Sequence, residues 1–245
     1  PRPILGISTP RRRRAQSSTR PRQAHVANGR ARVEALDTFQ GRVRNGQGLD
    51  STNGCAVIAP LVCHQHVTAK DARGATNAQV SKLIDSIVPP ILAHIRQKHG
   101  LGSGAFIIPA DVHDYLYDAK AIDEKMFDGV HGGNVLDAAH LGNLLSAFEQ
   151  IPATHRAACA FFFKEHVTAI LRVGGAYHFI DSMPGEHPSR MGTRTVCTDV
   201  DVLRCHLMTY ATKKLPAAVD GREWNDMTAE FDPRVFQAFL WKNQT

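Results

Sequence analysis

The stretch GCAVIAPLVCHQH, residues 54–66, is preceded by the polar segment DSTN at 50–53, and it decides how we interpret the chain. A small, hydrogen-bonding lead-in before an apolar run predicts a loop that opens a buried helix, with Cys55 at the helix N-terminus. Unpaired backbone N–H groups and the positive end of the helix dipole stabilise a thiolate there, and they can also hold an oxyanion. Pro60, in the body of this helix, should bend or shorten it.

Composition sets the broad class. With 245 residues and 43% apolar content, the chain can bury the core of one large domain or two small ones. Its 5 cysteines are an odd number without a CxxC pair, which favours free thiols in a reducing compartment. We find neither a signal-peptide segment nor a membrane-spanning run, so we expect a soluble, cytoplasmic or nuclear protein without a membrane partner.

The positive charge is concentrated in a tail. The net charge is +6, but residues 1–33 hold nine Arg and no Asp or Glu, and residues 34–245 have a net charge of −3. Rich in Arg, Pro, Ser and Thr, the segment 1–33 is predicted to be disordered, and 34–245 to form a single domain. The run Arg11, Arg12, Arg13 and Arg14 suits contact with nucleic acid or an import receptor, although a solvated tail explains it equally well.

Hydrophobic periodicity predicts helices early and strands late. We expect helices over 54–67, over 76–99 in two pieces interrupted at Pro89-Pro90, over 109–119, over 134–151, from Thr198 or Asp199 to about 215, and from Asp232-Pro233 to about 241. Strands are expected over 105–108, 157–163, 166–173 and 176–181, with an edge strand over 193–197. This order indicates an α+β domain.

The two strands around Gly174-Gly175 predict a β-hairpin whose side chains can be assigned to faces. With those glycines as the turn, Thr168 lies opposite Asp181, and His166 lies on the same face, diagonal to Asp181 and within reach of it. The other face carries Val167, Ala169, Leu171 and Val173, which should pack inward, and His178 opposite Leu171. A one-residue slip of the register would reverse this assignment.

A thiol at a helix N-terminus, an imidazole and a carboxylate together form the nucleophile, base and orienting group of thiol acyl transfer. We assign these roles to Cys55, His166 and Asp181. The other four cysteines, at 63, 159, 197 and 205, are expected to be core residues because free cysteine is among the most buried residue types.

A family resemblance rests on two motifs. HVTAILRVGGAYHFIDS, residues 166–182, resembles the His strand, hairpin and acidic or amide strand of papain-like cysteine peptidases, most of all the Josephin-type and MINDY-type deubiquitinases. Asn53-Gly54-Cys55 is similar to the start of their nucleophile helix. The resemblance implies a papain-like fold, with N-terminal helices packed on a late antiparallel sheet. It also implies hydrolysis of amide or isopeptide bonds, with ubiquitin or a ubiquitin-like protein as the substrate.

The chain departs from that pattern at the oxyanion hole. These families usually place a Gln five or six residues before the Cys, and here those positions are Leu49 and Asp50. We therefore expect Asn53 or, as a second choice, Gln47 to take this role, or backbone N–H groups to act alone.

Other functions remain open at this point. The same triad serves acyltransferases and transglutaminase-like enzymes, which differ only in the acceptor, and product analysis with and without an added amine separates them from hydrolases. A non-enzymatic domain with a basic nucleic-acid-binding arm is the third interpretation. Cys63, His64 and His66 do not suit a metal, because His64 and His66 point roughly 160° apart on a helix. We expect no metal and no cofactor.

Overall fold

One seven-stranded sheet organises the computed structural model, which describes residues 30–43, 49–71, 73–185, 187–216, 219, 223–225, 228 and 232–244. Its strand order is β1-β6-β5-β4-β3-β7-β2, and every neighbouring pair is antiparallel. The strands are β1 Ala31–Ala35, β2 Phe127–Asn134, β3 His155–Phe163, β4 His166–Val173, β5 Ala176–Asp181, β6 Thr193–Cys197 and β7 Val235–Gln244.

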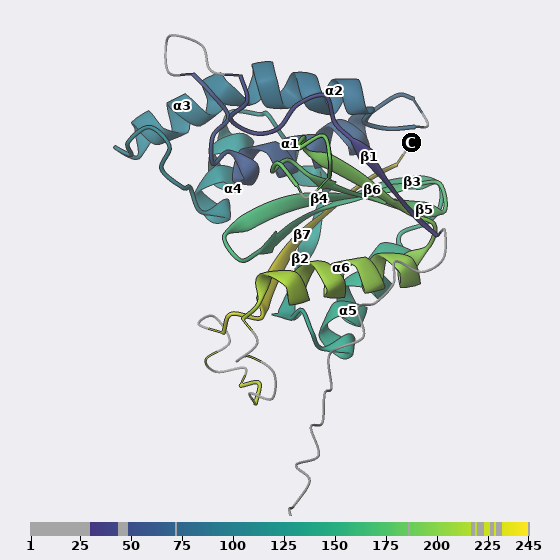
Figure 1. Cartoon of the computed structure of the whole chain (residues 1–245). Coiled ribbons are helices and arrows are strands. Elements are labelled where there is room, and N and C mark those ends of the chain that lie inside the picture. Colours follow the sequence, from purple (N-terminus) through teal and green to yellow (C-terminus); the bar gives the residue numbers. More distant parts are fainter. Residues whose placement is uncertain are drawn as a thin grey trace, which may run out of the picture.

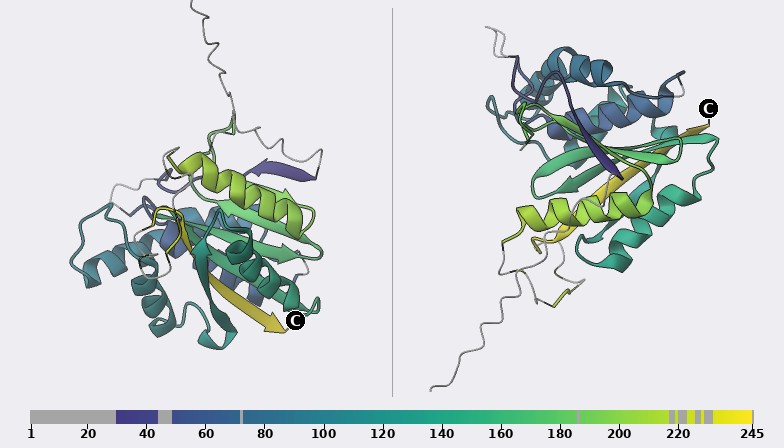
Figure 2. Two further views of the ribbon diagram at one scale, coloured as in Figure 1. Left: turned by 90° about the horizontal axis from the view of Figure 1, so that it is seen from below. Right: turned by 45° about the vertical axis from the view of Figure 1, so that its right-hand side comes forward.

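Helices cover both faces of this sheet, so the molecule has three layers (Figures 1 and 2). The first layer holds α1 Cys55–Thr68, α2 Asn77–Lys82, the π-helical turn η1 Leu83–Ile87, α3 Val88–Lys98 and α4 Pro109–Asp118. The opposite face carries α5 Ala138–Gln150 and α6 Val200–Lys214, while the short 3₁₀ turn η2 Glu124–Met126 precedes β2. The fold is thus α+β with an antiparallel sheet, as the sequence predicts.

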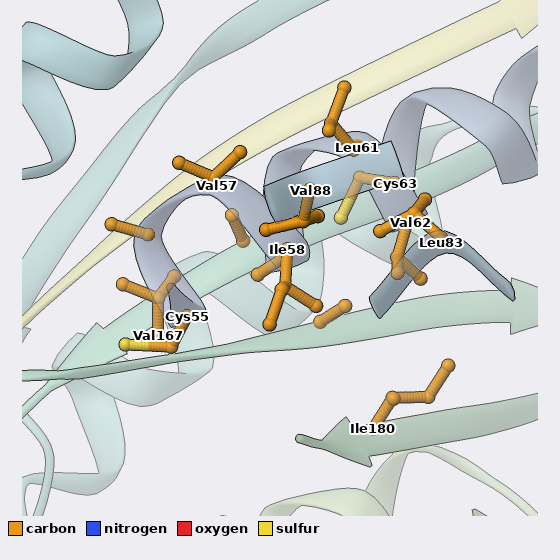
Figure 3. Close-up of a cluster of buried hydrophobic side chains, with 14 of the residues drawn as sticks. Cys55, Val57, Ile58, Leu61, Val62, Cys63, Leu83, Val88, Val167 and Ile180 are labelled. Atoms are coloured by element: carbon orange, nitrogen blue, oxygen red, sulfur yellow. The ribbon is translucent and has the colours of Figure 1, made fainter. Parts of the chain in front are cut away.

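The alternation of β4 divides its side chains between two cores. Val167, Ala169 and Leu171 belong to the core on the α1 side, as predicted for that face. Ile170 belongs to the core under α5 and α6. Figure 3 shows α1 lying along the sheet, with Cys55 beside Val167. Because both faces are covered, β4 presents a nearly continuous apolar sequence without a solvent face.

Helix α1 is longer than Pro60 would suggest. α1 runs for 14 residues with Pro60 inside it, so the shortening that we considered does not occur. Eleven of its residues are buried between the sheet and the neighbouring helices. This packing on all sides outweighs the one backbone hydrogen bond that a proline removes.

The N-terminal boundary and the sheet edge differ from expectation. Residues 31–33 belong to β1, so the tail predicted for 1–33 extends too far; they are held by backbone pairing with β6. Because β1 covers it, β6 is an inner strand and the edge position predicted for 193–197 is wrong. Residues 1–29, with Arg11 to Arg14, lie outside the described residues, and the division into tail and single domain stays a prediction.

Four further elements correct the sequence-based prediction. Residues 105–108 form no strand, and 232–241 form no helix because 235–244 are the buried strand β7. The helix predicted from 134 begins at Ala138, capped by the Asp137 carboxylate, since Asn134 ends β2. The break expected at Pro89-Pro90 is instead a π-helical turn just before them, where the Val88 N–H bonds to the Leu83 carbonyl. Prolines lack the N–H that an α-helical pattern would need, and the wider turn absorbs this loss.

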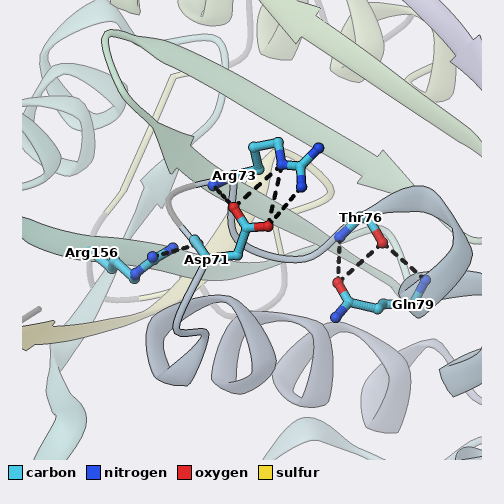
Figure 4. Close-up of polar contacts among 5 residues, drawn as sticks. All are labelled: Asp71, Arg73, Thr76, Gln79 and Arg156. Carbon is cyan, nitrogen blue, oxygen red and sulfur yellow. Dashed lines mark hydrogen bonds and ion pairs between the residues drawn. The ribbon is translucent and has the colours of Figure 1, made fainter.

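The loop after α1 is tied to the sheet. The Arg156 Nη2 donates to the Asp71 carbonyl oxygen at 2.5 Å, and the Asp71 carboxylate pairs with Arg73 at 2.8 Å (Figure 4). The same figure shows the capping box in which Thr76 and Gln79 satisfy each other's backbone N–H groups at the start of α2. These contacts fix the far end of the helix that begins at Cys55.

Candidate active site

A tight turn places Cys55 at the first position of α1. The Gly54 N–H donates to the Ser51 carbonyl at 2.9 Å, and the Asp50 carboxylate accepts from the Thr52 N–H at 2.8 Å. A Cβ at position 54 would lie 2.7 Å from the Ser51 carbonyl oxygen, which requires glycine there. The polar lead-in therefore works as predicted, as a turn that sets the start of a buried helix.

The Cys55 thiol is buried among apolar side chains but has polar neighbours. The residue is 3% exposed, and it shares its cleft with His166. Burial alone would raise the pKa of this thiol. The hydrogen-bonding and positive charge of His166, with the backbone N–H groups of Val167 and Ala56, outweigh burial and bring the pKa below 9.0.

His166 begins β4 and connects the thiol to a carboxylate. Its Nε2 lies 2.7 Å from Asp181 Oδ1, which leaves Nδ1 as the ring nitrogen for Cys55. Burial lowers the pKa of His166, but the hydrogen bonds and charges of Asp181 and Cys55 raise it to about 9. Both shifts favour the ionised forms, an imidazolium beside a thiolate.

Asp181 ends β5 and is held by two donors. Its Oδ1 accepts from His166 and, at 2.9 Å, from the Met183 N–H. Burial would raise the pKa of this carboxyl, yet the hydrogen bond and charge of His166 keep it below its usual value. Acceptance of the ring N–H fixes the orientation and tautomer of the imidazole.

The predicted hairpin register is confirmed. Val173 pairs with Ala176 and Leu171 with His178 across the Gly174-Gly175 turn, and the pairing runs on to Ala169 and Ile180, one residue short of Thr168 and Asp181. His178 points away from the triad; its Nδ1 lies 3.0 Å from an Arg194 nitrogen. The hydrogen bond between His166 and Asp181 is thus the diagonal contact that the alternation of the strands predicts.

A cleft of about 530 Å³ contains all four residues that the sequence singled out, Asn53, Cys55, His166 and Asp181. The other residues of its wall come from four separate loops and from the end of α6: Gln40, Phe106, Lys164, Glu165, Met183, Pro184, Gly185 and Lys214. The structure therefore brings the predicted nucleophile, base and orienting group to one accessible depression.

Gln40 is the functional candidate that the sequence analysis missed. Its backbone N–H donates to the Ser182 carbonyl at 2.8 Å, and its side-chain Oε1 accepts from the Ser182 hydroxyl at 2.9 Å. The Nε2 donor contacts the Met183 sulfur, a weak acceptor, at 2.9 Å. A glutamine fifteen positions before Cys55, beyond the spacing of five or six, thus presents an amide in the cleft.

Asn53 stands in the turn before Cys55 with a positive φ of 54°. Its Nδ2 donates to the Gly104 carbonyl at 2.6 Å, which ties the loop between α3 and α4 to the cleft. One amide hydrogen is therefore engaged. Gln47, the second choice, lies outside the described residues.

The remaining thiols differ from Cys55. Cys63, Cys159 and Cys197 are buried, as expected, and burial raises the pKa of each. Cys205 is exposed, so its predicted core position is wrong: it lies on the solvent side of α6. Within the described ranges no three His, Cys, Asp or Glu side chains gather as a metal site would require. The described helices also include none with the length and apolar character to cross a membrane.

Comparison of the sequence with protein families gives no match, and neither does comparison with curated proteins. Among solved structures, the fold is similar to a ubiquitin-specific protease from a murine cytomegalovirus tegument protein, determined in complex with a ubiquitin-based suicide substrate. The TM-score is 0.53, with 11% sequence identity over 87% of each chain. At this identity the likeness shows a similar fold alone, and it does not single out the Josephin or MINDY type.

Proposed function

We propose that this chain is a thiol peptidase that hydrolyses amide or isopeptide bonds at the C-terminus of ubiquitin or a ubiquitin-like protein. The observation that carries the proposal is the hydrogen bond between the His166 ring and the Asp181 carboxylate, in a cleft that the Cys55 thiol also lines. The fold shared with a ubiquitin-specific protease supports the choice of substrate.

In this proposal Cys55 is the nucleophile. The thiolate attacks the carbonyl carbon of the scissile bond, and the His166 imidazolium donates its proton to the leaving amine. Water then enters, His166 accepts its proton, and the thioester is hydrolysed to release the carboxylate product and the free thiol. Asp181 orients His166 and stabilises its charged form in both steps.

The oxyanion of the tetrahedral intermediate needs donors close to Cys55. The Cys55 backbone N–H belongs to the first turn of α1, where N–H groups have no intrahelical acceptor. Gln40 and Asn53 line the same cleft. Asn53 already donates its amide to Gly104, whereas the Gln40 amide nitrogen donates to a thioether sulfur, a weak acceptor, so we assign the second donor to Gln40 first and Asn53 next.

A ubiquitin carrying a C-terminal electrophile tests this function. The wild-type chain should form a covalent adduct, and Cys55→Ala should form none. Cys205→Ala is the matched control, because Cys205 is the exposed cysteine and would take up any non-selective reagent. An absent adduct in the wild type, or one that survives Cys55→Ala, would rule the proposal out.

A further inference from the structure

Residues 105–108 join α3 to α4, in the helical layer that also holds α1 (Figure 1). Their sequence, AFII, is typical of a strand, yet they pair with no strand among the described residues. The backbone is nevertheless extended at Ile108, with φ −72° and ψ 146°. Exposure alternates as it does along a strand: Phe106 and Ile108 are 61% and 62% exposed, while Ile107 between them is 7% exposed.

Phe106 and Ile108 are the two most exposed large apolar side chains in the described part of the chain. Ile107 packs into the core on the α1 side, so its two neighbours point the other way. Phe106 lines the catalytic cleft together with Cys55 and His166. Aromatic side chains contribute a large apolar area to binding surfaces, so an exposed one in the wall of this cleft indicates a contact for a ligand.

The turn that carries Cys55 holds this segment in place. The guanidinium of Arg96, a residue that is 7% exposed, donates to the Ala105 carbonyl at 3.0 Å and to the Thr52 carbonyl at 2.7 Å. The neighbouring Gly104 carbonyl accepts from the Asn53 side chain at 2.6 Å. These contacts position the segment before any ligand binds, and a preformed surface loses little conformational entropy on binding.

The backbone of the segment has open hydrogen-bonding groups. The carbonyls at its two ends are engaged, with Arg96 and with the first turn of α4. Between them, no hydrogen bond from the described residues reaches the N–H groups of 106–108 or the carbonyls of Phe106 and Ile107. Open groups on an extended backbone pair readily with a second extended chain, as they do at a free sheet edge.

We propose that residues 105–108 bind the acyl side of the substrate, which is the part that stays bonded to Cys55 in the thioester. An extended substrate segment pairs with this backbone and packs a large apolar side chain against Phe106. The leaving amine takes its proton from His166 and so lies against that ring. The wall that is tied to the Cys55 turn therefore receives the acyl side. This inference rests on the proposed function and adds the residues that select the substrate.

The rate of adduct formation with a ubiquitin that carries a C-terminal electrophile tests this inference, because the probe has an acyl side and no leaving peptide. Phe106→Ser should lower the second-order rate about tenfold, and Phe106→Leu should recover most of it. Alkylation of Cys55 by iodoacetamide should keep its wild-type rate in both variants, since this small reagent needs no contact with the segment.

Val130→Ser is the matched control. Val130 is also an exposed apolar residue, with 54% of its surface accessible, but it lies on the edge strand β2 and not in the wall of the cleft. This variant should form the adduct at the wild-type rate.

Hydrogen–deuterium exchange tests the backbone pairing. The N–H groups of residues 106–108 should exchange about tenfold more slowly, or slower still, in the ubiquitin adduct than in the free chain, because pairing with the substrate protects them.

Several outcomes overturn the inference. A wild-type rate of adduct formation in Phe106→Ser, or equal exchange in the adduct and the free chain, contradicts it and leaves the proposed function standing. A parallel fall in alkylation would mean that Phe106 acts on the thiol and not on the substrate. Loss of self-association in Phe106→Ser, with an unchanged adduct rate, would assign this surface to a second copy of the chain. No adduct in the wild type contradicts the proposed function and the inference together.

Discussion

His166 Nε2 and Asp181 Oδ1 lie 2.7 Å apart, across the open end of the β4–β5 hairpin. This contact fixes the ring so that its other nitrogen is directed to Cys55. Asp181→Ala removes the acceptor and the charge, so kcat for hydrolysis of a ubiquitin C-terminal amide should fall by about 10²–10⁴-fold. Asp181→Asn keeps an acceptor oxygen and should lose less. Equal activity of Asp181→Ala and the wild type would exclude an orienting role.

The pH dependence of Cys55 reactivity follows from the shifted pKa values of Cys55 and His166. The pKa of Cys55 is lowered and that of His166 is raised to about 9, so the ion pair exists from the pKa of Cys55 up to about pH 9. The alkylation rate of Cys55 should therefore rise with pH through a midpoint below 9.0, and peptidase activity should decline above about pH 9 as His166 loses its proton.

The substitution His166→Gln should change the pKa of the Cys55 thiol in the opposite direction. It removes the charge and hydrogen-bonding of His166, which lower the pKa of Cys55, while burial remains, so the alkylation midpoint should move to a higher pH than in the wild type. Iodoacetamide kinetics, with Cys55 followed by peptide mass spectrometry, measure both profiles. Identical midpoints in the two proteins would contradict the pairing.

Gln40 should matter for the chemical step. Both Gln40→Ala and Gln40→Glu remove the amide donor, and loss of one oxyanion donor costs about 10²–10³ in kcat. Asn53→Ala should have a smaller effect, because the Asn53 amide is engaged with Gly104. Ser182→Ala removes the hydroxyl that holds Gln40 and keeps the donor, so it serves as the control. A kcat within threefold of wild type for both Gln40 variants would remove Gln40 from the mechanism.

The turn beside His166 carries strain that a substitution should relieve. Lys164 and Glu165 connect β3 to β4 with φ values of 53° and 60°, a conformation that favours glycine. Glu165→Gly should raise the free energy of unfolding by about 0.5–1 kcal/mol, because relief of the left-handed conformation exceeds the entropy that glycine loses. Urea unfolding measures this, and Glu165→Ala should change little. If the Glu165→Gly variant is less stable than the wild type, the turn is not strained.

The sequence predicts the local features of the site well. The hairpin around Gly174-Gly175 follows from a two-residue turn and strand alternation, and α1 follows from a polar turn before an apolar run. The sequence analysis missed Gln40 because its place beside Cys55 depends on contact between two separate loops. The Gly41 N–H, next to Gln40, donates to the hydroxyl of Ser51, in the turn before Cys55, at 2.9 Å. No periodicity in a sequence reports such a contact.

The missed strands have physical explanations. β7 is buried on both faces, with Phe236 and Leu240 in one core and Trp241 in the other, so its sequence lacks the alternation that marks a half-buried strand. The Asp232-Pro233 pair before it mimics a helix start. β2 is an edge strand with three glycines and few buried side chains, which gives almost no strand signal.

Release of a fluorophore from the C-terminal amide of ubiquitin tests the central claim most directly. The wild-type chain should turn over this substrate repeatedly, Cys205→Ala should match it, and Cys55→Ala should fall to background. If the wild type releases no fluorophore, or if Cys55→Ala releases it at the wild-type rate, Cys55 is not the nucleophile of a ubiquitin-directed peptidase.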